Sequence, residues 1–176
     1  MPATIMIADY NPAWPDMFTA EKARLMAVIG DHVADIQHIG STSVPGLGAK
    51  PVIDIMIGVR VLADADAYCI APIIGLGYEY VKAFEVELPF RRYFRKDNAD
   101  GMRTHQIHLV EIESDWWERH LVFRDYLRTH REASEAYGRL KRELATQPFK
   151  TTNDYAEAKT DFITAVEAQA FAWKGE

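Results

Sequence analysis

The sequence is poor in cysteine, in long apolar runs and in excess positive charge. Cys69 is the one cysteine among 176 residues, so no internal disulfide forms and we expect a protein of the reducing cytoplasm. No window approaches roughly 18 uncharged apolar residues, and the first residues lack a basic segment before an apolar one, so we expect neither a membrane-spanning helix nor a signal peptide. With 20 Lys and Arg against 26 Asp and Glu, the net charge is −6. This balance disfavours broad nucleic-acid binding, whereas a small anion held by a few local cations stays compatible with it.

The chain is 48% hydrophobic and has neither internal repeats nor linkers. We therefore expect one domain over residues 1–176. Strands are predicted at 34–39, 52–59 and 78–82 and as a hairpin at 91–96 and 104–112; helices are predicted at 12–30, 64–75, 116–127, 129–144 and 154–172. The first helix is expected to start at Asn11–Pro12, and Thr129 with Glu132 to form a capping box. Strands in the first two thirds and helices in the last third predict an α+β fold with a helical C-terminal third.

Residues 40–51, GSTSVPGLGAKP, form a loop directly after a predicted strand. Gly40 lets the backbone approach a ligand closely, and Ser41 and Thr42 add hydroxyl donors beside free backbone N–H groups. Such a loop favours a phosphate without requiring a strongly basic protein. Two better-known phosphate motifs do not fit, because a P-loop ending at Lys50 requires serine or threonine at the next position and a dinucleotide fingerprint requires glycine there, whereas the chain has Pro51.

Asp54 stands among the apolar residues of 52–59, VIDIMIGV, a pattern that predicts a central strand buried on both faces. A carboxylate in such a strand needs a cation, a metal ion or a set of hydrogen-bond donors opposite it. Two interpretations stay open at this point. Asp54 is either a structural aspartate bonded to backbone or to an arginine, or a functional carboxylate facing the loop.

The segment HIGSTSVPGLGAKPVIDI, residues 38–55, resembles the signature of the GrpB (glutamate-rich protein B) family. This family is a group within the nucleotidyltransferase superfamily and also occurs fused to dephospho-CoA kinase in some bacteria. Matching segments lie along nearly the whole chain: YNPAWPDMF near the start, LGYEY at 76–80, FRDYLR at 123–128 and YAEAKTDFI at 155–163. The resemblance implies a fold similar to that of DNA polymerase beta and the antibiotic nucleotidyltransferases, a small mixed sheet with helices.

The resemblance also implies a site. The superfamily pattern is a hydrophobic residue, Gly and Gly or Ser, followed after a gap by Asp, a hydrophobic residue and Asp or Glu. Ile39, Gly40, Ser41 and Asp54 match this pattern, which implies that Asp54 is catalytic and a ligand of Mg²⁺. Met56 departs from it, because it stands where the second carboxylate belongs. Alternate strand residues share a face and clamp the ion together, and one carboxylate alone holds Mg²⁺ poorly.

Histidines add candidates of lower specificity. His105 and His108 lie three positions apart on a predicted strand, so they point to opposite faces and we do not expect them to chelate one ion. The superfamily takes a third carboxylate from a later strand, which implies a position near His108 or Glu111. For His108, and for His38 before the Gly-Ser turn, a satisfied or exposed side chain is the alternative.

The basic strand 91–96, RRYFRK, carries cations on both faces, which predicts a partly exposed position near a sheet edge or a pocket rim. Arg92 and Arg95 are candidates for binding triphosphate oxygens, because guanidinium groups bind them bidentately. A solvated edge is the alternative. Lys50 directly after the loop is a further candidate, and the match through YAEAK adds Lys159.

Three functions therefore stay open, and the third and least favoured is a helix-rich interaction protein whose Gly-Ser loop is only a turn. In the first, the protein is an enzyme that binds a nucleoside triphosphate through the Gly-Ser loop and these cations, and transfers a nucleotidyl or phosphoryl group to an unknown small acceptor with Asp54 and Mg²⁺. In the second, it is a catalytically degenerate module for a nucleotide or CoA-related ligand, which Met56 and the fusion to a CoA-pathway kinase favour. The acceptor, the base and the oligomeric state are undetermined by the sequence.

Overall fold

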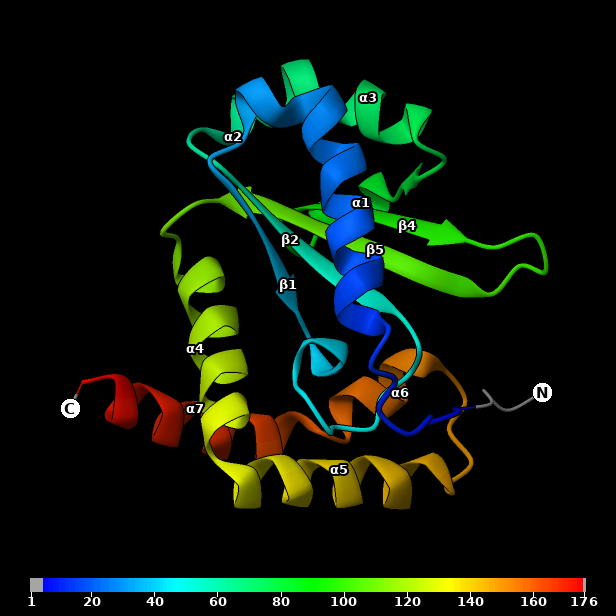
Figure 1. The fold of residues 1–176 in the computed structure, drawn as a ribbon, viewed down its shortest axis with the longest axis vertical. Helices are drawn as coiled ribbons and strands as arrows, with labels where there is room; N and C mark the ends of the chain where they lie inside the picture. The colour runs from blue at the N-terminus through cyan, green and yellow to red at the C-terminus, as the bar shows by residue number, and fades with distance from the viewer. Residues whose placement is uncertain (1–4, 176) are drawn as a thin grey trace.

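A five-stranded sheet surrounded by helices forms the centre of the computed structural model, which describes residues 5–175 (Figure 1). The strands are β1 Asp35–Ile39, β2 Ile53–Val59, β3 Glu79–Tyr80, β4 Arg92–Asp97 and β5 Arg103–Glu111. The helices are α1 Trp14–Ile29, α2 Leu62–Asp64, α3 Ile70–Gly75, α4 Asp115–Thr129, α5 Arg131–Ala145, α6 Thr152–Glu157 and α7 Thr160–Lys174. The α+β fold predicted from the sequence is confirmed.

The strand order is β1-β2-β5-β4-β3, with β2 and β5 parallel and every other pair antiparallel. This mixed sheet places β2 between β1 and β5, and the residues on its two faces pack into separate apolar clusters. Ile53, Ile55 and Met56 are accordingly 0% exposed. The continuous apolar run that predicted a strand buried on both faces is confirmed.

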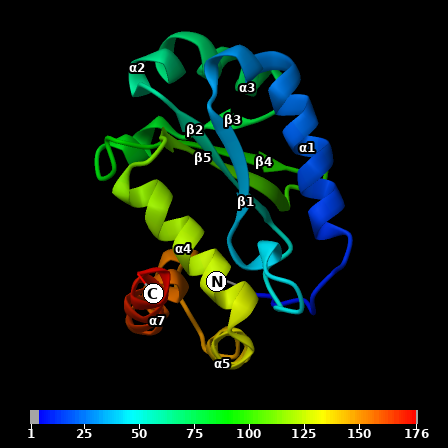
Figure 2. The same cartoon turned by 60° about the vertical axis from the view of Figure 1, so that its left-hand side comes forward.

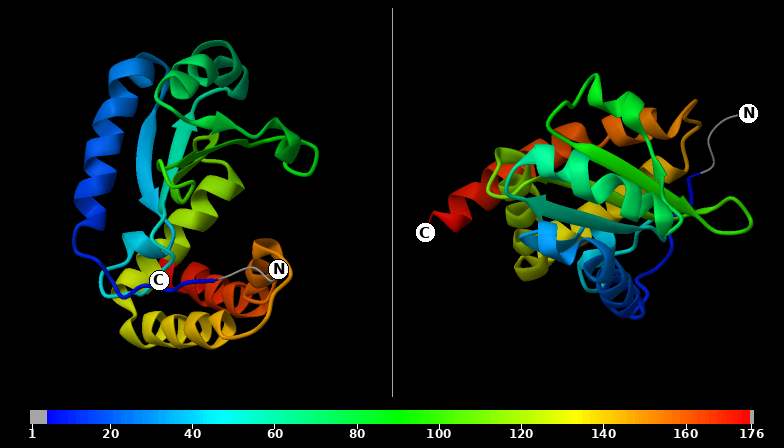
Figure 3. Two further views of the ribbon diagram at one scale, coloured as in Figure 1. Left: turned by 90° about the vertical axis from the view of Figure 1, so that its right-hand side faces the viewer. Right: turned by 90° about the horizontal axis from the view of Figure 1, so that it is seen from above.

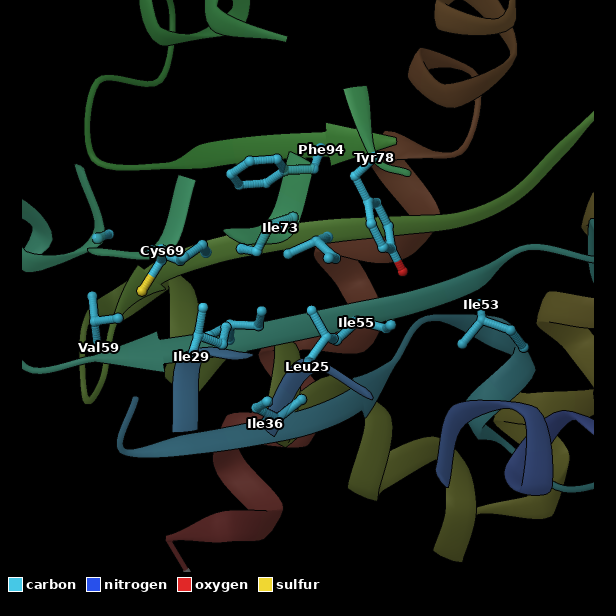
Figure 4. Packing of buried hydrophobic residues seen from close by; sticks show 14 of the residues in the cluster. Leu25, Ile29, Ile36, Ile53, Ile55, Val59, Cys69, Ile73, Tyr78 and Phe94 are labelled. Atoms are coloured by element: carbon cyan, nitrogen blue, oxygen red, sulfur yellow. The ribbon is translucent and has the colours of Figure 1, made fainter. Parts of the chain in front are cut away.

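Helices α1 and α3 cover one face of the sheet, and α4 lies on the other (Figure 2). Leu25 and Ile29 from α1 pack beside Ile55 of β2 and Ile73 of α3 in the larger core (Figure 4). On the opposite face, Trp117 of α4 forms a small apolar cluster with Ile39, Met56 and Val110. No helix within residues 5–175 combines the length and the apolar character that crossing a membrane requires.

The C-terminal helices gather at the end of the sheet where β1 ends and β2 begins (Figures 1 and 3). Residues of α4, α5 and α7 pack there against Val44 and Leu47 of the glycine-rich loop. A second cluster joins Leu144 of α5 and Tyr155 of α6 to Ile5. The loop that follows β1 therefore lies between the sheet and the C-terminal third of the chain.

Three predicted helix boundaries are wrong. The first helix begins at Trp14, because the Asn11 side chain accepts a hydrogen bond from the Ala13 amide before the helix starts. The Thr129 hydroxyl donates to the Asp125 carbonyl within α4 and caps nothing in α5. The predicted helix 154–172 is two helices, of which the first is capped by a box between Thr151 and Asp154.

Candidate functional site

A cleft of about 520 Å³ lies between the loop after β1, the start of β2 and the C-terminal helices. Its lining includes six of the residues predicted from the sequence: Ser41, Thr42, Lys50, Asp54, Arg95 and Lys159. It also includes residues that were not predicted, among them Arg103, Gln106, Lys141 and Tyr155. Asp54 is the one carboxylate among the described residues that line the cleft.

Gly40 brings the loop against Asp54. Ile39, the last residue of β1, pairs with Asp54 on β2, and Gly40 follows with φ 70° and ψ −177°. A Cβ at position 40 would lie 2.4 Å from Asp54 Oδ2 and 3.0 Å from Asp54 Cβ. Glycine is therefore required twice here, for the backbone conformation and for the close approach of the carboxylate.

The turn at Ser41–Ser43 is a single 3₁₀ turn, closed by hydrogen bonds from the Ser43 amide to Gly40 and from the Val44 amide to Ser41. The backbone N–H groups of Ser41 and Thr42 have no partner within this turn. Ser41 is half-buried at the edge of the cleft, so its hydroxyl and its N–H group are placed to meet a ligand.

Asp54 is held by neutral donors. Gln106 lies opposite it on β5 and donates from Nε2 to Asp54 Oδ1 at 2.5 Å. The amide oxygen of Gln106 accepts in turn from the Tyr93 hydroxyl at 2.5 Å, which fixes the orientation of the amide. Asp54 Oδ2, which lies against Gly40, accepts no hydrogen bond within residues 5–175, so one carboxylate oxygen has no donor.

His108 lies beside Asp54, with its Nε2 3.7 Å from Asp54 Oδ1. Arg91 is a pure donor and contacts His108 Nδ1 at 3.2 Å, so Nδ1 accepts and Nε2 carries the proton toward Asp54. Burial lowers the pKa of His108 below its usual range. His108 is thus a neutral donor beside the carboxylate and not a proton acceptor at Nε2.

Three lysines converge on the cleft from different elements. Lys50 Nζ lies 4.5 Å and Lys159 Nζ 4.6 Å from the centre of the Tyr155 ring. Lys141 Nζ donates to the Gly48 carbonyl and lies 4.7 Å from the centre of the Tyr137 ring. None of the three forms an ion pair with a carboxylate of the described residues.

Burial lowers the pKa values of these three lysines, and neighbouring positive charges lower those of Lys141 and Lys159 further. Burial, together with the charges of Lys159 and Arg142, lowers the pKa of Lys141 to about 7. Burial and the charge of Lys50 lower the pKa of Lys159 to about 8. Burial also lowers the pKa of Lys50, and Asp54 opposes that shift. A group of lysines that are partly buried, without ion-pair partners and mutually repulsive is the arrangement that an anion stabilises.

The magnesium site implied by the resemblance does not fit these residues. Asp54 Oδ1 accepts a hydrogen bond from Gln106 where a second carboxylate would stand, and Met56 is packed in the apolar cluster under Trp117. The β5 residue that faces Asp54 is an amide and not a carboxylate. Within the described part of the chain, no group of three or more His, Cys, Asp or Glu side chains could hold a metal ion.

Three predicted site residues lie elsewhere. Arg92 is on the opposite face of β4, where it forms a bidentate pair with Asp66 at 2.6 and 2.8 Å. Glu111 accepts from the Leu62 amide and lines a separate hollow of about 670 Å³ at the other end of β5. His38 faces the larger core, stacked on Phe18 and bonded to Thr42. The predicted separation of His105 and His108 onto opposite faces is confirmed, since His105 lies near Glu21 while His108 faces Asp54.

The position of Arg92 leads to a stability prediction. Arg92 lowers the pKa of Asp66, so this pair stabilises the fold above the usual pKa of an aspartate and the contribution is lost as the pH falls through the lowered value. Asp66 is 46% exposed and therefore screened, so Asp66→Asn should lower the free energy of unfolding at pH 7 by only about 1 kcal/mol. Urea unfolding of the wild type and the variant at neutral and acidic pH measures this loss of stability. The control is Asp64→Asn, on the same helical segment, and an equal loss in both variants would contradict the assignment.

The sequence contained signals for two of the residues that were not predicted. Lys141 lies on the apolar stripe of α5 with Tyr137 and Leu144, where a lysine is out of place unless its ammonium group has a function. Gln106 is two residues before His108 and therefore shares its strand face. That it meets Asp54 follows from the register of β2 and β5, which a single sequence does not contain.

The chain is similar to known proteins over nearly its whole length. The family described as GrpB protein matches residues 4–169. The chain is 39% identical over 165 residues to UPF0157 protein YqkA of Bacillus subtilis, covering 94% of this chain and 47% of YqkA, and so spans about half of that relative. It is 33% identical to glutamate-rich protein GrpB of Alkalihalophilus pseudofirmus, covering 92% and 93% of the two chains. The crystal structure of conserved protein GrpB from Enterococcus faecalis superposes with a TM-score of 0.86 at 34% identity, covering 97% of this chain and 100% of the other.

Proposed function

Because the chain belongs to the GrpB family, we propose that the cleft between its Gly-Ser loop and its C-terminal helices is the site of function, and that the site binds the polyphosphate of a nucleotide. The observation that carries this proposal is the convergence of Lys50, Lys141 and Lys159 on one cleft in a protein of net charge −6. Lysine ammonium groups and the free N–H groups after Gly40 are complementary to phosphate oxygens.

Aromatic side chains on the sheet side of the cleft favour a nucleotide over a bare polyphosphate. Phe84 and Tyr93 both line the cleft, with ring centres 5.2 Å apart. Phe84 is 41% exposed, so part of this residue is open to a ligand. A nucleotide base stacks on such a ring, while Arg95 and Arg103 beside it supply donors for the sugar or the base.

Isothermal titration calorimetry with ATP, GTP, CTP, UTP and inorganic triphosphate tests this function. We expect saturable binding of the triphosphates, with a nucleotide binding more tightly than inorganic triphosphate because it adds the stacking contact. Absence of binding by all five ligands would contradict the proposal. Tighter binding of inorganic triphosphate than of every nucleotide would restrict the site to polyphosphate.

The lysine pKa values predict a pH dependence of binding. A polyanion binds the protonated forms of Lys141 and Lys159, so affinity should be highest below pH 7 and fall as the pH rises through about 7 and about 8. We expect the Kd for inorganic triphosphate to rise by about tenfold or more between about pH 7 and 9, since each lost proton removes one charge from the site. Calorimetry across this pH window measures the change in Kd. In Lys141→Met, we expect the Kd to vary less with pH in the lower part of the window. A constant Kd would mean that neither lysine meets the phosphates.

Nucleotidyl transfer is the second candidate, favoured by Asp54, which lines the cleft and whose Oδ2 accepts no hydrogen bond within the described residues. In this reaction an acceptor hydroxyl oxygen bonds to the α-phosphorus, the bond from that phosphorus to the bridging oxygen breaks, pyrophosphate leaves, and the acceptor proton passes to Asp54. Pyrophosphate release across a panel of small hydroxyl and amino acceptors measures transfer. Binding without release over the whole panel would instead identify a binding module.

A further inference from the structure

We propose that the cleft binds its phosphate ligand without a divalent cation, with the three lysines supplying the charge that a metal ion supplies at a two-carboxylate site. This inference rests on the proposed function and specifies how the same site recognises its ligand. It concerns Asp54, Gln106 and the lysines, all of which lie within the described lining of the cleft.

The first support is that the carboxylate pair has been replaced by protein donors. Gln106 donates to Asp54 Oδ1 at 2.5 Å from the strand position that faces it. Arg91 holds His108 in the tautomer whose Nε2–H points toward the same oxygen. The hydrogen bond from Gln106, with the His108 Nε2–H group 3.7 Å away, partly compensates the charge of Asp54 at Oδ1.

The second support is the position of Met56. On β2 it shares a face with Asp54, but its side chain is 0% exposed and packs with Ile39, Val110 and Trp117. The second clamp position is therefore part of the hydrophobic core. A hard, octahedral cation meets one carboxylate oxygen here instead of the set it prefers.

The third support is the charge balance of the cleft. Arg95 and Arg103 are paired with Glu79 and Asp97, so these two cations are already neutralised. The three lysines have no ion-pair partner within the described residues, which leaves up to three positive charges facing one carboxylate. Phosphate oxygens that lie on these ammonium groups need no bridging ion.

The inference reverses the expected effect of the Asp54 carboxylate on ligand affinity. At a metal site the aspartate attracts the ligand through the ion, and its removal abolishes binding. At a site without metal the same carboxylate repels the phosphates, and its neutralisation strengthens binding. Asp54→Asn keeps the shape of the side chain, so the variant separates the two cases.

The experiment is calorimetry of inorganic triphosphate and ATP with the full chain, in excess EDTA and in millimolar MgCl₂. For the wild type we expect binding in EDTA at least as tight as in MgCl₂, because Mg²⁺ on the ligand masks charges that the lysines recognise. Asp54→Asn should bind about three- to tenfold more tightly in EDTA. Binding by the wild type only in MgCl₂, or a tenfold loss in Asp54→Asn, would overturn the inference and leave the proposed function standing.

Gln106→Glu is the matched variant, and it keeps the test decisive if Asp54→Asn folds poorly. It places a second carboxylate opposite Asp54 on the neighbouring strand and so restores a pair that can hold Mg²⁺. We expect its affinity for triphosphate to fall about tenfold in EDTA and to recover in MgCl₂. Equal affinity of this variant and the wild type in both buffers would contradict the charge balance on which the inference depends. If no triphosphate binds the wild type in either buffer, the proposed function itself is wrong.

Discussion

Replacing Gly40 by alanine should lower the free energy of unfolding by about 4 kcal/mol, the largest effect on stability that we expect from a single methyl group in this chain. The backbone at φ 70° and ψ −177° lies in a region that only glycine adopts readily. The added Cβ would also lie 3.0 Å from Asp54 Cβ, which is fixed to the β2 backbone, so rotation of the carboxylate does not relieve the clash. Either β1 and β2 move apart or the Gly-Ser turn is displaced.

Urea unfolding compares this variant with Gly46→Ala, its matched control. Gly46 also has a positive φ, 79°, but a Cβ there would meet nothing within 4 Å. In the control, the free energy of unfolding should therefore fall only by the cost of a left-handed alanine, about 1–2 kcal/mol. Equal losses at the two positions would show that contact with Asp54 does not determine the conformation of the loop.

Replacing Lys159 by methionine should change affinity and stability in opposite directions. Loss of its hydrogen bonds to phosphate is expected to cost about 1.5–3 kcal/mol of binding free energy, a rise of about 10- to 150-fold in the Kd for inorganic triphosphate. Without ligand the variant should be more stable than the wild type by about 1 kcal/mol at pH 7, because a repelled and partly buried charge is removed.

Calorimetry and urea unfolding on the same preparation measure both effects. Lys150→Met is the control, since Lys150 is exposed, lies outside the described lining of the cleft, and its loss changes the net charge equally. An unchanged Kd in Lys159→Met, or the same rise in Lys150→Met, would remove Lys159 from the phosphate site. A fall in stability would instead show that the ammonium group has a structural partner.

The fold could be predicted from the sequence because its elements have strong local patterns. The apolar run VIDIMIGV predicted β2 to within a residue, and alternation in RRYFRK placed Arg92 and Arg95 on opposite faces. Helix ends were harder to predict, since several hydroxyl and amide side chains compete for the same cap. At Thr129 the hydroxyl donates to the Asp125 and Tyr126 carbonyls of α4 and so does not cap the helix that follows.

The candidate site could be predicted only in part. Asp54, the Gly-Ser turn and Lys50 are close in sequence, so one loop and one strand place them together. Arg92 was predicted to bind phosphate together with Arg95, although the two lie on opposite faces, because the sequence does not show which face of a strand meets the cleft. Lys141 and Gln106 enter the site through helix packing and strand register, which depend on contacts between distant segments.

The cleft joins regions that are far apart in the chain. Lys141 of α5 bonds to the carbonyl of Gly48, 93 positions away, and Lys159 reaches the cleft from the start of α7. Lys159 repels both Lys50 and Lys141 across this junction, and the polyanion of the proposed function would turn this repulsion into attraction. Such a ligand would act as a non-covalent cross-link between the sheet and the C-terminal helices. By mass action it would add about 2.7 kcal/mol to the stability of the whole fold at a hundredfold excess over its Kd.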